Sequence, residues 1–231
     1  MSTSPVSISY FSDVLCVWAY VAQARLEALK QKFGQNIIIT PYHVTLFGDC
    51  EQRIALGWKE RGGYTGFNQH VIQVGEQFPH VELNPKVWLS NPPKSSGNAH
   101  LFLKAVQIAT SDTQSSKEQN ELQLLKQMEW AIRLAFFRDG RDVSDFGVLY
   151  DIAQQFKVSK ESINSQLNNG SAIALFCREL AMREKYKLEG SPTYVLNESR
   201  QKLFGNVGYR IIEANVSELL TEANPNRASW C

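Results

Sequence analysis

A strand pattern near the start of this 231-residue chain leads straight into a helical pattern, with a cysteine at the junction. Residues 6–11 alternate like a strand, and residues 18–33 carry the apolar spacing of a helix that ends at Gly34. Cys16 therefore lies at the first turn of the helix. Free N–H groups and the helix dipole stabilise an anion there, so we predict a thiol with a lowered pKa. The alternative is a small buried hydrophobic residue, the usual state of a lone cysteine.

A β-branched run at residues 36–40 follows this helix and predicts a second, buried strand. Strand, helix and strand in this order form a right-handed crossover unit with two parallel strands. The carboxyl ends of parallel strands share one edge of the sheet, where ligands bind. Cys16 follows the first strand and His43 follows the second, so His43 is a candidate substrate-binding residue. A structural role is the alternative, because a near-neutral pKa suits histidine to both.

The middle of the chain, residues 46–186, is dominated by helical patterns. Glycines interrupt its first part, and the proline-dense segment 84–93 excludes a helix interior. The clearest helical patterns cover residues 99–109, 122–137, 148–156, 160–167 and 172–185. Strand signals return at residues 193–197 and 202–205, and the polar turn between them predicts an antiparallel hairpin. A last helix is predicted at residues 209–223.

Charge and composition restrict the partners. The chain has 24 Lys and Arg, 23 Asp and Glu and a net charge of +1, with no basic block, which argues against nucleic acid and acidic membranes as main partners. No apolar run is long enough to span a bilayer, and the first residues lack the pattern of a signal peptide. We therefore expect a cytoplasmic protein without a membrane partner.

The cysteines lack the spacing of metal ligands, so we predict free thiols in a reducing compartment and no metal site. They are Cys16, Cys50, Cys177 and Cys231. Cys177 lies inside an apolar helical pattern, and burial is expected to make it inert. Cys231 lies in the C-terminal tail, and a mobile terminus could bring it back to a distant site.

The cysteine segment resembles a known family. A strand followed by Cys-X-X-Cys at the start of a helix is the thioredoxin-like redox pattern. Residues 13–18 and 25–27 resemble the cytosolic branch of the DsbA-like family, which also holds kappa-class glutathione transferases and 2-hydroxychromene-2-carboxylate isomerases. In this chain Ala19 occupies the second cysteine position. The resemblance therefore implies a nucleophilic role for Cys16 and none for Ala19.

A second segment, residues 189–195, resembles the cis-proline loop of the same family. The resemblance implies a cis bond between Ser191 and Pro192, with Pro192 counted among the catalytic residues and the loop lying against Cys16. The Ser191 backbone then offers a strand edge to an extended peptide or to glutathione. Residues 136–145 also resemble the cytosolic branch.

The strand-to-helix turn near the C-terminus resembles the place where kappa-class enzymes hold the γ-glutamyl end of glutathione. A helix start with free N–H groups suits a carboxylate there. The substrate-binding residues implied around the cysteine and in this turn are Ser12, Asp13, Trp18, His43, Ser191, Gly205, Asn206 and Val207.

The resemblance implies an α/β, thioredoxin-like fold with a large all-helical insertion. The expected boundaries are a thioredoxin-like domain at residues 1–45 and 187–223, a helical insertion domain at residues 46–186 and an irregular tail at residues 224–231. The implied function is thiol–disulfide exchange through Cys16 alone, with glutathione as the cosubstrate that resolves the intermediate.

Two alternatives stay open. One is a glutathione transferase or glutathione-dependent isomerase of the kappa or 2-hydroxychromene-2-carboxylate type, in which the Cys16 thiol stabilises the glutathione thiolate. The other is a non-catalytic binding protein on the same fold. The expected partners are glutathione or a disulfide-containing peptide or protein, and a homodimer is a further possibility.

Overall fold

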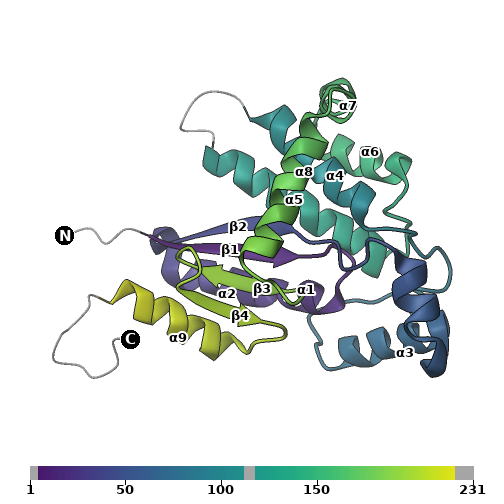
Figure 1. Cartoon of the computed structure of the whole chain (residues 1–231), viewed down its shortest axis with the longest axis horizontal. Helices are drawn as coiled ribbons and strands as arrows, with labels where there is room; N and C mark the ends of the chain where they lie inside the picture. Colours follow the sequence, from purple (N-terminus) through teal and green to yellow (C-terminus); the bar gives the residue numbers. More distant parts are fainter. Residues whose placement is uncertain (1–4, 112–117, 222–231) are drawn as a thin grey trace.

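The computed structural model describes residues 5–111 and 118–221 and shows a four-stranded mixed sheet with helices on both faces (Figure 1). The strands are β1 (Val6–Ser12), β2 (Ile37–His43), β3 (Thr193–Leu196) and β4 (Gln201–Phe204), in the order β2-β1-β3-β4. The first two strands and the last two come from opposite ends of the chain. The predicted crossover unit and the predicted hairpin therefore meet in one sheet.

Strand pairing brings one end of each of the four strands to the same edge of the sheet. β1 runs parallel to β2, with Ser12 opposite His43 at the carboxyl end. β3 runs antiparallel to β1 and to β4, with Thr193 opposite both Phe11 and Phe204. The carboxyl ends of β1, β2 and β4 thus lie beside the start of β3. The loops at this edge hold the candidate site.

The helix after β1 differs from the single helix that the sequence predicts. It consists of α1 (Val17–Val21) and α2 (Gln23–Phe33), separated at Ala22. The Ala19 carbonyl accepts a hydrogen bond from Arg133 Nη1 at 3.2 Å, and among the described residues it accepts none from the Gln23 N–H. A side chain that takes a carbonyl out of the helical ladder interrupts the helix at that point.

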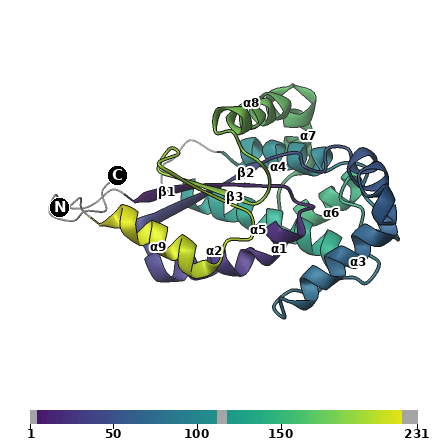
Figure 2. The same ribbon diagram turned by 60° about the horizontal axis from the view of Figure 1, so that its bottom comes forward.

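The two faces of the sheet are covered by different helices (Figure 2). α2 and α9 (Tyr209–Leu220) pack against one face, where Ile8, Tyr10 and Leu29 belong to the core. α8 (Ser171–Lys185) covers the other face, where Phe11 and Val195 are buried with Met182 and Tyr186 against them. The alternation of side chains along β1 therefore supplies both cores, as the period of two requires.

The segment between β2 and β3 consists of helices and loops, with no strand in residues 44–111 or 118–192. Its helices are α3 (Gly63–Glu76), α4 (Gly97–Thr110), α5 (Glu118–Phe137), α6 (Phe146–Gln155), α7 (Lys160–Asn168) and α8. Short helical turns in it are η2 (Glu51–Leu56) and η3 (Lys59–Arg61), and a further one, η1 (Gly34–Asn36), precedes β2. The predicted thioredoxin-like fold with a helical insertion is confirmed.

Within the described parts of the chain, no helix has the length and apolar character needed to cross a membrane. α9 ends at Leu220, before the predicted limit. The predicted irregular tail, residues 224–231 with Cys231, lies outside the described residues.

Candidate active site

Cys16 lies at the start of α1, where the sequence predicts it. It is the N-cap residue, and its carbonyl accepts the N–H groups of Ala19 and Tyr20 at 3.1 and 3.0 Å. The Cys16 N–H donates to the Asp13 carbonyl at 3.1 Å, which closes a tight turn between β1 and α1. This turn holds the thiol at the carboxyl edge of the sheet, with 5% of the residue exposed.

The loop before β3 lies directly against this thiol. The Ser191–Pro192 peptide bond is cis, as the sequence predicts. Cys16 Sγ donates to the Ser191 carbonyl oxygen at 3.3 Å, and the Asp13 N–H donates to Ser191 Oγ at 3.0 Å. Within the described part of the chain, the Ser191 N–H has no hydrogen-bond partner. Two hydrogen bonds therefore fasten the loop to the cysteine turn and leave this backbone donor unused.

The turn between β4 and α9 is joined to the same loop. The Gly205 N–H donates to the Pro192 carbonyl at 2.8 Å, and Gly205 has φ 85°, a conformation that favours glycine. Asn206 is exposed and Val207 is partly buried. The Val207 N–H closes a tight turn on the Gly205 carbonyl at 2.8 Å, and α9 begins at Tyr209, where the sequence predicts it.

Apolar side chains lie beside the cis-proline loop and near the Cys16 turn. Phe204 at the end of β4 is 47% exposed, and its ring lies so close to Gly190 that a Cβ there would come within 2.9 Å of it. Leu46 lies on the same side of Gly190, at 3.9 Å from that position. Trp18, a predicted substrate-binding residue, is partly buried and packs edge-on against Phe78, with 6.4 Å between the ring centroids. Phe204 and Leu46 therefore place apolar surface beside Gly190, at the start of the cis-proline loop.

Asp13 holds the site together from inside. Its Oδ1 accepts the Leu15 N–H at 2.9 Å, and its Oδ2 accepts the Phe47 N–H at 2.9 Å and the Ser96 hydroxyl at 2.8 Å. These donors come from three different segments, and Asp13 has no exposed surface. The prediction that Asp13 contacts substrate is therefore corrected: its carboxylate is fully used inside the protein.

Ser12 faces a buried ion pair. Its hydroxyl accepts from Arg133 Nη2 at 2.8 Å and donates to Glu129 Oε1 at 3.3 Å. Arg133 and Glu129 themselves pair at 2.6 Å as i,i+4 neighbours on α5. Ser12 has no exposed surface, so its predicted contact with substrate is also corrected. It links the end of β1 to α5 instead.

His43 lies between two buried carboxylates. Its ring Nδ1 is 3.5 Å from Glu179 Oε2 and its Nε2 is 3.8 Å from Glu129 Oε1. Its backbone N–H donates a hydrogen bond to Glu179 Oε2 at 2.9 Å. Glu179 also pairs with Lys104 at 2.5 Å. Burial, helped by the charge of Lys104, lowers the pKa of His43 well below its ordinary value. With no exposed surface, His43 cannot contact a substrate in this conformation, which corrects that prediction.

His100 connects this cluster to the cysteine turn. Its Nε2 accepts the Val14 N–H at 3.2 Å, and its ring centroid lies 4.9 Å from that of His43. Burial lowers the pKa of His100 to about 4, which keeps the ring neutral and able to accept. We call the whole cluster the buried ionic layer, and its members are His43, His100, Lys104, Glu129, Arg133 and Glu179.

Burial reverses the predicted shift in the pKa of Cys16. Burial raises the pKa of the thiol, while hydrogen bonds from the Ser191 side chain and the N–H groups of Ala19 and Trp18 lower it less, and the charge of Asp13 raises it further. α1 has only five residues, so few peptide dipoles add up at its start. The prediction of a lowered pKa is therefore wrong, and the resting group is a thiol.

The other described cysteines differ from each other. Cys50 is fully buried, and burial raises its pKa to about 12, which makes it unreactive. Cys177 is exposed on α8, against the prediction, because Ala172 and Phe176 carry the buried face of that helix. Among the described residues, no cluster of His, Cys, Asp and Glu side chains could hold a metal ion.

Sequence reasoning missed the buried ionic layer, although two signals point to it. Lys104 is a single charge inside a long apolar run on α4, and a lysine there is almost never buried unless it is paired. Glu129 and Arg133 stand four residues apart, the spacing of an ion pair on one helix face. Neither signal identifies the partner on another helix.

The chain belongs to the DsbA-like thioredoxin family, because residues 7–216 match the DSBA-like thioredoxin domain. A search of curated proteins finds no significant match.

Solved structures agree with this fold. The probable DsbA oxidoreductase of Streptomyces coelicolor aligns with a TM-score of 0.69 and 16% identity over 96% of this chain and 93% of its own. The cytosolic disulfide reductase DsbM of Pseudomonas aeruginosa aligns with a TM-score of 0.62 and 14% identity over 92% and 99%. A 2-hydroxychromene-2-carboxylate isomerase gives 0.62 and 12% over 92% and 95%. At these identities the likeness concerns the fold.

Proposed function

We propose that this protein catalyses thiol–disulfide exchange through Cys16 as its single nucleophile. The observation that carries the proposal is the 3.3 Å contact between Cys16 Sγ and the Ser191 carbonyl, with Ala19 where a paired cysteine would stand. The thiol thus lies beside an unused backbone donor, that of Ser191. An extended chain that pairs with Ser191 would bring its sulfur to Cys16.

The reaction proceeds in two exchanges. The Cys16 thiol gives its proton to water, and the thiolate attacks the glutathione sulfur of a mixed disulfide between glutathione and a substrate. The substrate leaves as a thiolate that takes up a proton. A second glutathione thiolate then attacks the glutathione sulfur of the new mixed disulfide. Glutathione disulfide leaves, and the released Cys16 thiolate takes up a proton, which restores the resting thiol. The substrate is reduced and glutathione disulfide is the oxidised product.

Glutathione as the second thiol is supported by geometry and by one comparison. A structure of DsbM was determined with GSH. In this chain the Gly205 turn is bonded to Pro192 of the cis-proline loop, so a ligand paired with Ser191 can reach Gly205 and Asn206. A reducing cytoplasm, in which glutathione is abundant, is the matching location. Glutathionylated peptides or proteins are the matching partners.

The raised pKa of Cys16 favours a second candidate function. A thiol that stays protonated can donate a hydrogen bond, as Cys16 does to the Ser191 carbonyl. Donation to a bound glutathione thiolate instead would stabilise that nucleophile for a transferase or isomerase reaction. A hydroxyl can fill this role, whereas it cannot form a stable mixed disulfide.

The variant Cys16→Ser separates the two functions. For exchange, we expect the reduction of a glutathionylated peptide by glutathione to fall at least roughly a thousandfold, because the nucleophile is removed. For the second function, conjugation of glutathione to an aromatic electrophile, or isomerisation of a chromene carboxylate, would persist in Cys16→Ser. The exposed Cys177 supplies the control Cys177→Ser, which should keep full activity.

Each outcome decides between the candidates. Full exchange activity in Cys16→Ser contradicts the proposal. No activity of either kind in the wild-type protein, together with tight binding of a disulfide peptide, would identify a non-catalytic binding protein.

A further inference from the structure

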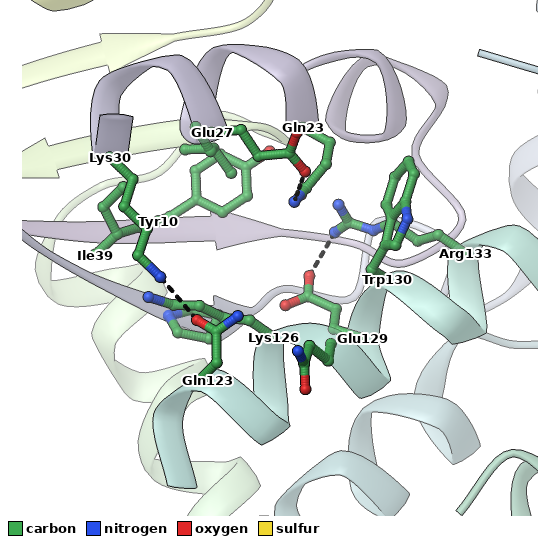
Figure 3. Close-up of a pocket in the computed structure, with 13 residues that line it drawn as sticks. Tyr10, Gln23, Glu27, Lys30, Ile39, Gln123, Lys126, Glu129, Trp130 and Arg133 are labelled. Carbon is green, nitrogen blue, oxygen red and sulfur yellow. Dashed lines mark hydrogen bonds and ion pairs between the residues drawn. The ribbon is translucent and has the colours of Figure 1, made fainter. Parts of the chain in front are cut away.

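A cavity lies between α2 and α5 (Figure 3). Its volume is about 200 Å³, and its floor is formed by side chains of β1 and β2. Cys16, Ser191 and Pro192 do not line it. The cavity is therefore distinct from the site of the proposed function and needs an explanation of its own.

Part of the lining of this cavity is apolar and aromatic. Tyr10 and Ile39 come from the sheet, Leu26 from α2 and Trp130 from α5. Tyr10 is 2% exposed, and its hydroxyl has no hydrogen-bond partner in the part of the chain that the structure describes. At about 30 Å³ for each water, the cavity equals about seven waters, which suits one small ring better than a large ligand.

Two lysines from opposite helices line the same cavity. Lys30 of α2 donates to Gln123 Oε1 of α5 at 2.8 Å, which fixes it across the gap between the helices (Figure 3). Lys126 of α5 forms no hydrogen bond or ion pair with any other described residue. Burial lowers the pKa of Lys126 to about 8, and the charge of Lys30 contributes in the same direction. Two like charges thus line one cavity, where the charge of Glu129 raises the pKa of Lys126 and opposes the effect of Lys30.

The carboxylates in the lining are already engaged. Glu129 pairs with Arg133 at 2.6 Å, and Glu27 accepts from Gln23 Nε2 at 3.0 Å (Figure 3). Arg133 is used further by Ser12 and the Ala19 carbonyl. Lys30, Lys126 and Arg133 stand against Glu27 and Glu129, so the lining carries one excess positive charge beside its aromatic side chains.

We propose that this cavity binds a small aromatic carboxylate, with its ring on Tyr10 and Trp130 and its carboxylate between Lys30 and Lys126. Each half of the ligand meets a matching group. The ring covers apolar surface, and the carboxylate balances the one excess positive charge of the lining. A charge-assisted contact to a partly buried lysine is stronger than one on an open surface.

Calorimetric titration with phenylacetate, phenylacetamide and acetate tests both halves of the proposal. Phenylacetate should bind at one site for each chain. Phenylacetamide keeps the ring and loses the charge, and acetate keeps the charge and loses the ring, so each should bind at least roughly tenfold more weakly. Absence of phenylacetate binding, or equal binding of phenylacetamide, would overturn the proposal.

Variants place the binding in the cavity. Lys126→Met keeps the length of the side chain and should weaken phenylacetate binding roughly tenfold, whereas Lys126→Arg should retain it. Lys59→Met, at an exposed lysine outside the cavity, is the matched control and should bind like the wild type. Cys16→Ser should also bind like the wild type. Equal affinity in Lys126→Met, or lost affinity in Cys16→Ser, would assign the binding elsewhere and overturn the proposal.

Discussion

The cysteine site and the buried ionic layer share one edge of the sheet but are built in opposite ways. The cysteine site consists of short loops and backbone groups: the Cys16 turn, the Ser191–Pro192 loop and the Gly205 turn. The buried ionic layer consists of long charged side chains that reach in from α4, α5 and α8. Local turns therefore position the Cys16 sulfur, while distant helices supply the charged groups around this edge of the sheet.

The two regions also differ in the free energy that forming them costs. Backbone turns at an edge cost little to form, whereas buried charges must be matched in full, because an unpaired buried charge is strongly unfavourable. Changes in the buried ionic layer should therefore alter stability more than changes at the cysteine site.

Removing one charge from the layer should have the largest effect. Lys104→Met leaves Glu179 buried without its 2.5 Å partner, and we expect the free energy of unfolding to fall by roughly 3–5 kcal/mol. Urea denaturation measures this. The double variant Lys104→Met with Glu179→Gln removes both charges and keeps an acceptor for the His43 N–H, so it should recover more than half of the loss. A loss below about 1 kcal/mol in the single variant would mean that this pair is solvated.

Acid should destabilise the layer through its histidines. The pKa of His100 is about 4 in the folded protein and near 6.5 when unfolded, so the unfolded chain takes up a proton first as the pH falls. His100 should therefore cost roughly 3 kcal/mol of stability between pH 6.5 and pH 4. In His100→Gln this part of the pH dependence should disappear. His80→Gln, at an exposed histidine, is the control and should keep it.

The burial of Cys16 should be visible in how its alkylation rate depends on pH. Because burial raises the pKa of Cys16, its alkylation rate should keep rising with pH after that of a short cysteine peptide has levelled off. Mass spectrometry after brief treatment with iodoacetamide reports each cysteine separately. The exposed Cys177 should be modified in the native protein and the buried Cys50 should not. A Cys16 rate that is already constant at neutral pH would restore the lowered pKa that the sequence predicts.

The smallest effect is expected at the edge of the cysteine site. Phe204→Ala removes a half-exposed ring next to Gly190, and in a Cys16→Ser background it should weaken binding of a glutathionylated peptide by roughly three- to tenfold. Fluorescence anisotropy of a labelled peptide measures this. Leu56→Ala, at an exposed apolar residue on η2, is the control. Unchanged affinity in Phe204→Ala would remove this side chain from the proposed site.

Much of the fold could be predicted, because its signals are local. The strand before Cys16, the β-branched run of β2 and the hairpin of β3 and β4 each lie within a few residues. The break at Ala22 could not be predicted, since it depends on Arg133 reaching the Ala19 carbonyl from α5. The burial predicted for Cys177 was wrong for a related reason, because an apolar pattern in a helix does not show which side of the helix will face another element.

Short segments and a family pattern were enough to place a cysteine at the junction of a strand and a helix, with Ala19 in the second cysteine position and a cis-proline loop opposite. Long-range packing was needed to show that Asp13 is satisfied inside the protein, that Ser12 meets Glu129 and Arg133 across 117 and 121 residues, and that burial keeps Cys16 a thiol. The difference comes from burial: whether a polar group keeps its water depends on segments far away in the chain, and the energy of a charge depends on that water.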